Sequence, residues 1–248
     1  MPIYLLKYII FTLFFVQATF GQNNLEINYI IKYNTEIYNE KNGTLLLDVK
    51  QNKSIFFISK NNVKLNLPQE SNNINVIQKD VERFLTTDLK NDSLIFKEKI
   101  NNDIYIISEN VPKINWKLDA EITKKIDSFI CHKATANFRG RKYTAWYSLE
   151  YPIQMGPWKF NGLPGLIMEI YDENNRYYWG VTQINFTKKE VIFPNEISLY
   201  KKIDLRKYVE LRYDRIMDNI DTRLPRGTVI QTIKPERNGI EIKFEWED

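Results

Sequence analysis

Residues 129–149 read FICHKATANFRGRKYTAWYSL, and this stretch carries the strongest signal for the fold. β-Branched, aromatic and small residues lie on both sides of the basic segment 139–141, which predicts two strands joined by a tight turn. Because successive side chains of a strand point to opposite faces, Tyr143 and Tyr147 should share one face and Trp146 the other. The centre of the protein is therefore predicted to be a long antiparallel hairpin.

A turn containing Gly and Pro follows this hairpin. The segment 163–166, Leu-Pro-Gly-Leu, places proline second and glycine third, which is the pattern of a type II turn. Proline presets a negative φ, and glycine adopts a positive φ without steric cost. We therefore expect Gly162, Pro164 and Gly165 to form a structural turn, with a positive φ at Gly165.

Alternation of apolar and polar residues, which is typical of strands, recurs along the rest of the chain. It predicts further strands over residues 25–31, 44–49, 54–59, 93–99, 104–107, 166–170, 176–186 and 240–246. Helical spacing of apolar residues predicts helices over 76–89 and 204–220, the second with Asp204 as its N-cap. We expect a mainly β fold, an antiparallel curved sheet or incomplete barrel of about eight to eleven strands, with one or two helices packed on its concave side.

The N-terminal segment is typical of a signal peptide. Lys7 precedes an uncharged apolar run over residues 9–16, and the small or polar residues Ala18, Thr19 and Gly21 follow that run. A helix needs about 20 apolar residues to cross a bilayer, so this run is too short to span one. We expect residues 1–21 to be removed and residues 22–248 to form a single exported domain without a transmembrane segment. The expected location is the periplasm, the outer-membrane surface or the medium.

The composition excludes several kinds of site. The chain holds one cysteine and one histidine, which leaves no intramolecular disulfide and no ligand set for a Cys/His zinc site. The net charge is +4 and the basic residues alternate with acidic ones, so we expect no nucleic-acid partner. Gly162 and Gly165 lack the spacing of a phosphate-binding loop. We expect neither a metal nor a cofactor.

No catalytic residue is identified from the sequence. Cys131 and His132 are neighbours on a predicted strand, so their side chains point to opposite faces and form no dyad unless a bulge intervenes. The chain holds 31 acidic residues, and nothing in their spacing selects a pair for glycosidase-like chemistry. These features favour a protein without enzymatic activity, and a hydrolase with an unrecognised site stays open as an alternative.

The central segment resembles the GLPGLI family. The ordered blocks at residues 131–141, 145–147 and 156–167 carry this resemblance, and the last block contains the hexapeptide after which the family is named. Members of that family are exported proteins of Bacteroidota with a cleaved signal and no established activity. The resemblance implies export, and it carries over no catalytic residue.

Aromatic residues are concentrated between Tyr143 and Trp179, where they either fill a core or line a concave site. The candidate ligand- or partner-binding residues are Trp146, Trp158, Phe160 and Trp179. We expect a non-enzymatic periplasmic or secreted binding or envelope protein whose partner is an apolar small molecule or an envelope protein. A structural envelope-assembly partner without a ligand cavity is a further alternative.

Overall fold

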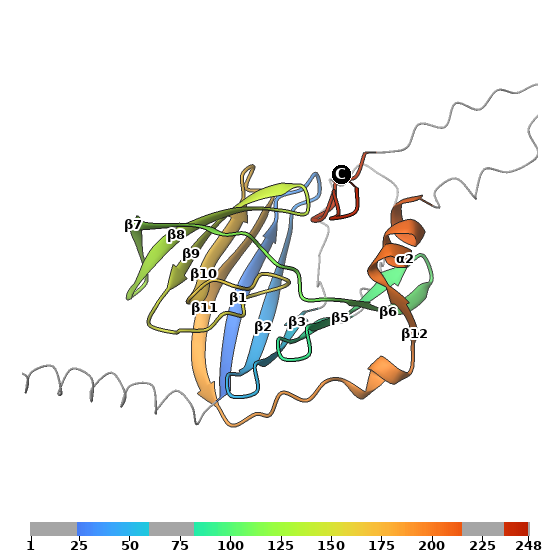
Figure 1. Ribbon diagram of the computed structural model, residues 1–248, viewed down its shortest axis with the longest axis horizontal. Helices are drawn as coiled ribbons and strands as arrows, with labels where there is room; N and C mark the ends of the chain where they lie inside the picture. The colour runs from blue at the N-terminus through green and yellow to red at the C-terminus, as the bar shows by residue number, and fades with distance from the viewer. Residues whose placement is uncertain (1–23, 60–81, 215–235, 248) are drawn as a thin grey trace, which may run out of the picture.

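The computed structural model describes residues 24–59, 82–214 and 236–247, which form one strongly curved sheet with its concave side partly covered (Figure 1). The mainly β class predicted from the alternation is confirmed. The predicted signal peptide, residues 1–21, lies outside the described residues. No helix in the described ranges is both long enough and apolar enough to cross a membrane.

The described residues contribute twelve strands to the sheet. In chain order they are β1 (Asn24–Tyr33), β2 (Asn39–Asp48), β3 (Lys53–Ile58), β4 (Arg83–Asp88), β5 (Ser93–Ile100), β6 (Asp103–Glu109), β7 (Lys117–Ile126), β8 (Phe129–Phe138), β9 (Arg141–Ser148), β10 (Leu166–Asp172), β11 (Tyr177–Thr187) and β12 (Lys201–Asp204). Their spatial order is β12-β6-β5-β4-β3-β2-β1-β11-β10-β9-β8-β7. Neighbouring strands are antiparallel except for β12, which runs parallel to β6. The strand count exceeds the expected one because the alternation did not predict β4, β7 and β12.

The concave face of the sheet carries the main hydrophobic core. Ile27, Tyr29 and Ile31 of β1 point into this core, and each is 0% exposed. The hydroxyl of Tyr29 donates a hydrogen bond of 2.9 Å to the carbonyl oxygen of Ile167 in β10. Burial raises the pKa of this phenol, so the group stays a neutral donor. The bond reaches across β11 and fixes β1 relative to β10.

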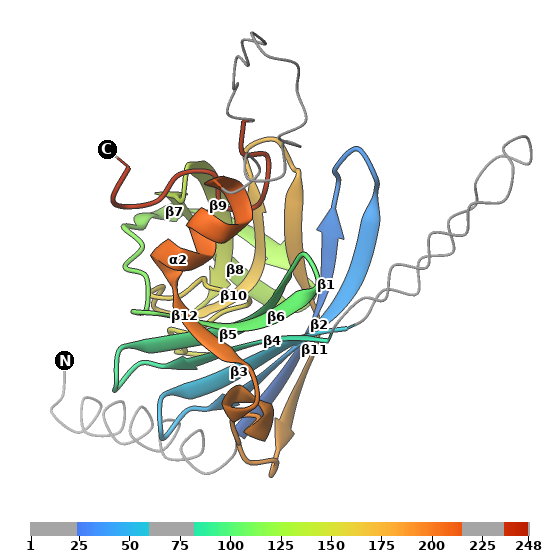
Figure 2. The same cartoon turned by 90° about the vertical axis from the view of Figure 1, so that its right-hand side faces the viewer.

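A short helix covers part of the concave face. α2 (Leu205–Val209) continues into one turn of π-helix, η2 (Glu210–Asp214), and lies in front of the sheet in Figure 2. The backbone N–H of Lys207 donates to Oδ1 of Asp204 at 2.7 Å, which confirms the predicted N-cap. The ring of Tyr208 meets the ring of Phe96 in β5 edge to face, with centroids 5.6 Å apart. The predicted helix thus begins where expected, and its residues 215–220 lie outside the described residues.

A smaller core lies on the opposite, convex face. Side chains of four strands form it beneath the segment 188–200, which includes the 3₁₀-helix η1 (Asn195–Ser198). Its buried members are Leu46, Ile55, Phe84 and Ile106. The ammonium of Lys97 lies 2.8 Å from Glu196 of η1 and holds the segment against the sheet.

Residues 83–88 form strand β4, so the helix predicted over 76–89 is wrong for this part. Phe84 packs in the convex core and its neighbour Leu85 in the concave core, so both faces of the strand are buried. A strand that is buried on both faces has no clean alternation. The apolar residues of β4 therefore also fitted the spacing of a helix, which led to the wrong prediction. Residues 76–81 lie outside the described residues.

The strand predicted over residues 240–246 is also wrong. Residues 236–247, which we call the C-terminal strap, have no regular secondary structure. The backbone N–H groups of Ile242 and Lys243 donate to the carbonyl oxygen of Arg139 at 3.0 and 3.2 Å. Glu241 belongs to the polar residues of the alternation over 240–246, but it is only 6% exposed. Contacts between this carboxylate and buried cations determine the path of the strap instead of a strand ladder.

The predicted type II turn at residues 163–166 does not form as expected, because Gly165 does not adopt a positive φ. Gly162 does, with φ of 85°. Gly165 is needed for a different reason: a Cβ atom there would lie 2.2 Å from the carbonyl oxygen of Ser148. The glycine allows the start of β10 to approach the end of β9.

Candidate ligand-binding cavity

A cavity of about 330 Å³ lies between the concave face of the sheet, α2 with η2, and the C-terminal strap. Figure 1 shows the strap between the sheet and the helix. The volume falls within the range of small-molecule sites. The lining includes seven aromatic residues, Tyr33, Phe84, Phe96, Trp158, Tyr177, Tyr208 and Tyr213, and the charged residues Arg83, Lys97, Glu98, Lys159, Arg212 and Glu241.

Trp158 is the most constrained of these aromatic residues. Its φ is 51°, in the left-handed region that a bulky side chain rarely adopts. Its ring stacks on the ring of Trp179, with centroids 5.9 Å apart and planes 14° apart, and it meets Phe160 edge to face. Backbone strain of this kind persists only where the surrounding structure enforces it, and it is concentrated at functional sites. The fold therefore holds the Trp158 indole in one position at the cavity.

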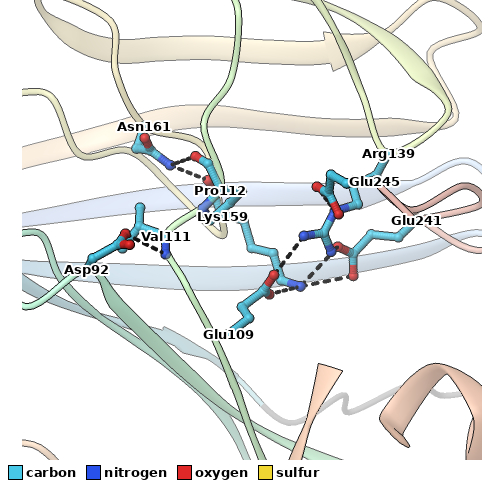
Figure 3. A network of polar contacts seen from close by, with 9 residues as sticks. All are labelled: Asp92, Glu109, Val111, Pro112, Arg139, Lys159, Asn161, Glu241 and Glu245. Atoms are coloured by element: carbon cyan, nitrogen blue, oxygen red, sulfur yellow. Dashed lines mark hydrogen bonds and ion pairs between the residues drawn. The ribbon is translucent and has the colours of Figure 1, made fainter. Parts of the chain in front are cut away.

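A buried network of charged groups adjoins the cavity (Figure 3). The ammonium of Lys159 lies 2.5 Å from Oε1 of Glu109 and 2.9 Å from Oε1 of Glu241. The guanidinium of Arg139 contacts Glu109 at 2.7 Å, Glu241 at 2.6 Å and Glu245 at 2.7 Å. The side chains of Arg139, Lys159, Glu109 and Glu241 are all less than a tenth exposed.

The opposite charges of the network favour the ionised forms of Glu109 and Arg139. Burial raises the pKa of Glu109, but the ammonium of Lys159 and the guanidinium of Arg139 outweigh burial and hold that pKa below its ordinary value. Burial lowers the pKa of Arg139, while the carboxylates of Glu241 and Glu109 raise it, so that the net pKa lies above its ordinary value. Removing one partner would leave an uncompensated buried charge, which is strongly destabilising.

The network joins four segments that are distant in the sequence. Glu109 ends β6, Lys159 lies in the loop between β9 and β10, and Glu241 belongs to the C-terminal strap. Arg139 lies at the tight turn between β8 and β9, where its φ is 49° and that of Gly140 is 83°. Positive φ angles at two successive residues are typical of short hairpin turns. The turn thus directs the guanidinium towards the strap, and the strap becomes one wall of the cavity.

The four predicted binding residues have different positions. Trp158 lines the cavity, whereas Phe160 and Trp179 are each 1% exposed and pack against Trp158 inside the core. Trp146 lies on the other face of β9, where the ammonium of Lys124 is 5.1 Å from its ring centroid. The structure therefore brings three of the four aromatic residues together and places Trp146 away from them.

Cys131 and His132 are separated from the cavity. Cys131 is 0% exposed, and burial raises the pKa of its thiol to about 11. The ring of His132 lies 5.8 Å from the ring of Tyr147. Within the described ranges, no group of three or more His, Cys, Asp or Glu side chains is arranged to hold a metal ion.

The alternation did not identify the charged residues of the cavity and its network. Glu109 and Glu241 have no special sequence context, since acidic residues are frequent throughout the chain. Lys159 does stand out, because it is flanked by Trp158 and Phe160, and a lysine between two aromatic residues is a signal for partial burial.

Comparison with known proteins gives a family match over a short segment. Residues 138–169 match the family described as "Protein of unknown function (Porph_ging)". This segment contains β9, the loop with Trp158 and Lys159, and the start of β10. Among curated proteins, none matches the chain.

Several solved structures resemble this fold. PNGF-II, solved in two space groups, aligns with a TM-score of 0.50 and 18% identity over 77% of this chain. The alignment covers 33% of the PNGF-II chain, so this chain spans about a third of that protein. The Pseudomonas aeruginosa MucA/MucB complex aligns with a TM-score of 0.37 and 9% identity, over 74% of this chain and 57% of that one. A putative outer membrane lipoprotein-sorting protein domain from Vibrio parahaemolyticus aligns with a TM-score of 0.31 and 7% identity, over 71% and 89% of the two chains.

Proposed function

We propose that this chain is an exported, non-enzymatic binding protein that holds a small molecule in the cavity beside Trp158. The observation that carries the proposal is the partly open cavity of about 330 Å³, which is bordered by the sheet, α2 with η2 and the strap. A site of this size with aromatic walls and a few polar groups is the usual form of a ligand pocket.

The position of Trp158 supports this proposal over a role in core packing alone. None of the buried aromatic residues in the described ranges has a positive φ, whereas Trp158 has a φ of 51°. Its partners Trp179 and Phe160 supply a buried platform for the indole. The ring therefore combines a fixed position with a place on the cavity wall.

The two alternatives fit these observations less well. A purely structural assembly partner needs no cavity at its concave face. A hydrolase needs groups with their acid or base function available, whereas Lys159, Arg139, Glu109 and Glu241 are engaged with one another. Networks of this kind perturb pKa values for structural reasons as well as catalytic ones. A role in holding the strap accounts for these four residues.

The proposal includes export and a family assignment. Residues 1–21 act as a cleaved signal, and residues 22–248 form a single domain of the GLPGLI type. The match over residues 138–169 supports this assignment, because it includes the hexapeptide at residues 162–167. N-terminal sequencing of the exported protein should find a first residue within one or two positions of Gln22, and an intact Met1 in the exported protein would contradict the signal assignment.

Ligand titration tests the binding function. Nile red, an uncharged apolar probe, should bind the purified protein saturably and quench tryptophan fluorescence. Trp158→Ala should abolish this binding, whereas the matched variant Trp146→Ala, on the other face of β9, should retain it. Equal binding by both variants would contradict a site at Trp158. Native mass spectrometry of protein purified from its own cells should show a retained small molecule.

A further inference from the structure

An orphaned acceptor lies in the cavity wall at Glu98 of β5. Its Oε1 is 3.6 Å from the guanidinium of Arg83, and its side chain is 17% exposed. Its Oε2 is buried and has no hydrogen-bond partner among the described residues. A buried acceptor without a donor costs free energy, and native proteins leave few of them. A donor group on a bound ligand would satisfy this oxygen.

A second orphaned acceptor lines the same cavity. Oδ1 of Asn39, at the start of β2, is also buried and has no partner in the described part of the chain. β2 and β5 are separated by β3 and β4 in the sheet, so their backbones are roughly 14 Å apart at the usual strand spacing. A ligand that satisfies both oxygens therefore carries donors at two well-separated points.

The charges around the cavity favour an uncharged ligand. A ligand carboxylate would be repelled by Glu98, and a ligand ammonium would lie close to Arg83 and Arg212, which line the same cavity. The other two cations of the lining are already engaged, Lys97 with Glu196 and Lys159 with Glu109 and Glu241. The guanidinium groups can donate to neutral oxygen atoms of a ligand. Groups that both donate and accept, such as hydroxyls, fit this combination.

The aromatic walls select a ligand with apolar faces as well. The rings of Tyr33 and Tyr177 meet edge to face with centroids 5.6 Å apart, and Trp158 adds an indole. An extended peptide would need an unpaired strand edge for its backbone. β1, β3 and β11, which line the cavity, are each paired on both sides, whereas β4 and β5 pair with each other only over Leu85–Asp88 and Ser93–Phe96. Only Arg83 and Phe84 of β4 extend beyond this ladder, so the site offers mainly ring faces and side-chain acceptors.

We infer that the cavity binds an uncharged ligand with several hydroxyl groups on apolar rings, which is the chemistry of a neutral oligosaccharide, and that Glu98 is its main hydrogen-bond acceptor. This inference rests on the proposed binding function and names the class of its ligand. Asn39 accepts a second hydrogen bond from the ligand, and Trp158, Tyr33 and Tyr177 contact its apolar faces.

A printed array of neutral and acidic oligosaccharides, followed by calorimetric titration, tests the inference. The purified exported protein should bind neutral members of the array and exclude acidic ones. Glu98→Gln should weaken the affinity for the best neutral member at least about tenfold, and Asn39→Ala should weaken it less. Glu173→Gln is the matched control, because Glu173 is 61% exposed and pairs with Lys142 in the turn after β10. Thermal unfolding of each variant identifies any loss of fold.

The outcomes separate this inference from the proposed function. Nile red binding without binding of any neutral oligosaccharide would overturn the ligand class and leave the binding function in place. Failure of both probes would overturn both. Preferential binding of acidic oligosaccharides, or unchanged affinity in a folded Glu98→Gln variant, would also overturn the inference. Binding of neutral oligosaccharides that is lost in Glu98→Gln and retained in Glu173→Gln would support it.

Discussion

The ammonium of Lys159 lies 2.5 Å from Oε1 of Glu109, and both side chains are almost inaccessible to solvent. Lys159 belongs to the loop that carries Trp158, and Glu109 ends β6, so the ion pair joins the loop to the part of the sheet that faces α2. Glu241 and Arg139 complete the network and attach the C-terminal strap. Each of these contacts positions a wall of the cavity.

The first prediction concerns the stability that this network provides. Lys159→Met retains most of the side-chain volume and removes the charge, which leaves Glu109 and Glu241 buried with one cation fewer. Breaking a buried pair in this way costs about 3–5 kcal/mol of unfolding free energy. Chemical denaturation measures the loss. Lys142→Met, at a pair whose side chains are 56% and 61% exposed, is the control and should cost less than about 1 kcal/mol. Equal losses in the two variants would contradict a buried network.

The second prediction is the pH dependence of stability. The pKa of Glu109 in the folded protein lies below its ordinary value of 4.5, so the folded state binds fewer protons than the unfolded state. The ionised Glu109 therefore stabilises the folded state at pH values above its ordinary pKa of 4.5. This contribution is lost as the pH falls through the lower pKa that Glu109 has in the folded protein. Thermal unfolding at decreasing pH should show a falling midpoint below about pH 4.5. Glu109→Gln should be less stable at neutral pH and should show a weaker acid dependence. An unchanged acid slope in that variant would count against the assignment.

The third prediction compares two glycines. Gly165 is required by a close contact with a neighbouring backbone, and Gly162 is required by its positive φ. A Cβ atom at Gly165 would lie 2.2 Å from the carbonyl oxygen of Ser148, whereas one at Gly162 would meet nothing closer than 3.9 Å. Gly162→Ala carries only the cost of a positive φ, about 1–2 kcal/mol. Gly165→Ala should cost about 3 kcal/mol or more, because the backbone must move. Denaturation midpoints compare the two variants, and the reverse order would show that the close approach to Ser148 does not constrain Gly165.

The fourth prediction concerns the two stacked indoles. Trp179 is 1% exposed, so Trp179→Ala should cost about 3–5 kcal/mol as for other buried aromatic residues. Trp158→Ala should cost less, because the Trp158 ring is partly exposed at the cavity. The substitution also relieves part of the backbone strain that the positive φ of Trp158 imposes, which lowers the cost further. Calorimetric unfolding of both variants decides the order. A larger loss for Trp158→Ala would assign its ring to the core.

The fifth prediction concerns the single cysteine. Cys131 is 0% exposed, and its pKa is raised by burial to about 11. Its thiol should therefore react with a disulfide reagent at pH 8 at least about a hundredfold more slowly than a model thiol, and at the ordinary rate in denaturant. Fast reaction of the folded protein would show that the β7–β8 edge opens readily.

The sequence by itself determined the hairpins of this protein. The pairs β5–β6, β8–β9 and β10–β11 are each formed by neighbouring segments with an alternating pattern and a short turn between them. The N-cap at Asp204 belongs to the same category, because its bond to Lys207 spans three residues. These features are local, so residue order alone contains the physical information that specifies them.

Only the tertiary structure decided β4, the path of the C-terminal strap and the cavity. β4 is a strand because β3 and β5 pair with it and both of its faces are buried, which removed the alternation that would have revealed it. The strap follows the contacts of Glu241 with Lys159 and Arg139, which are 82 and 102 residues away along the chain. The energy of such a pair depends on burial and on the distance between its charges. Neither quantity exists until the sheet has curved and brought the three segments together.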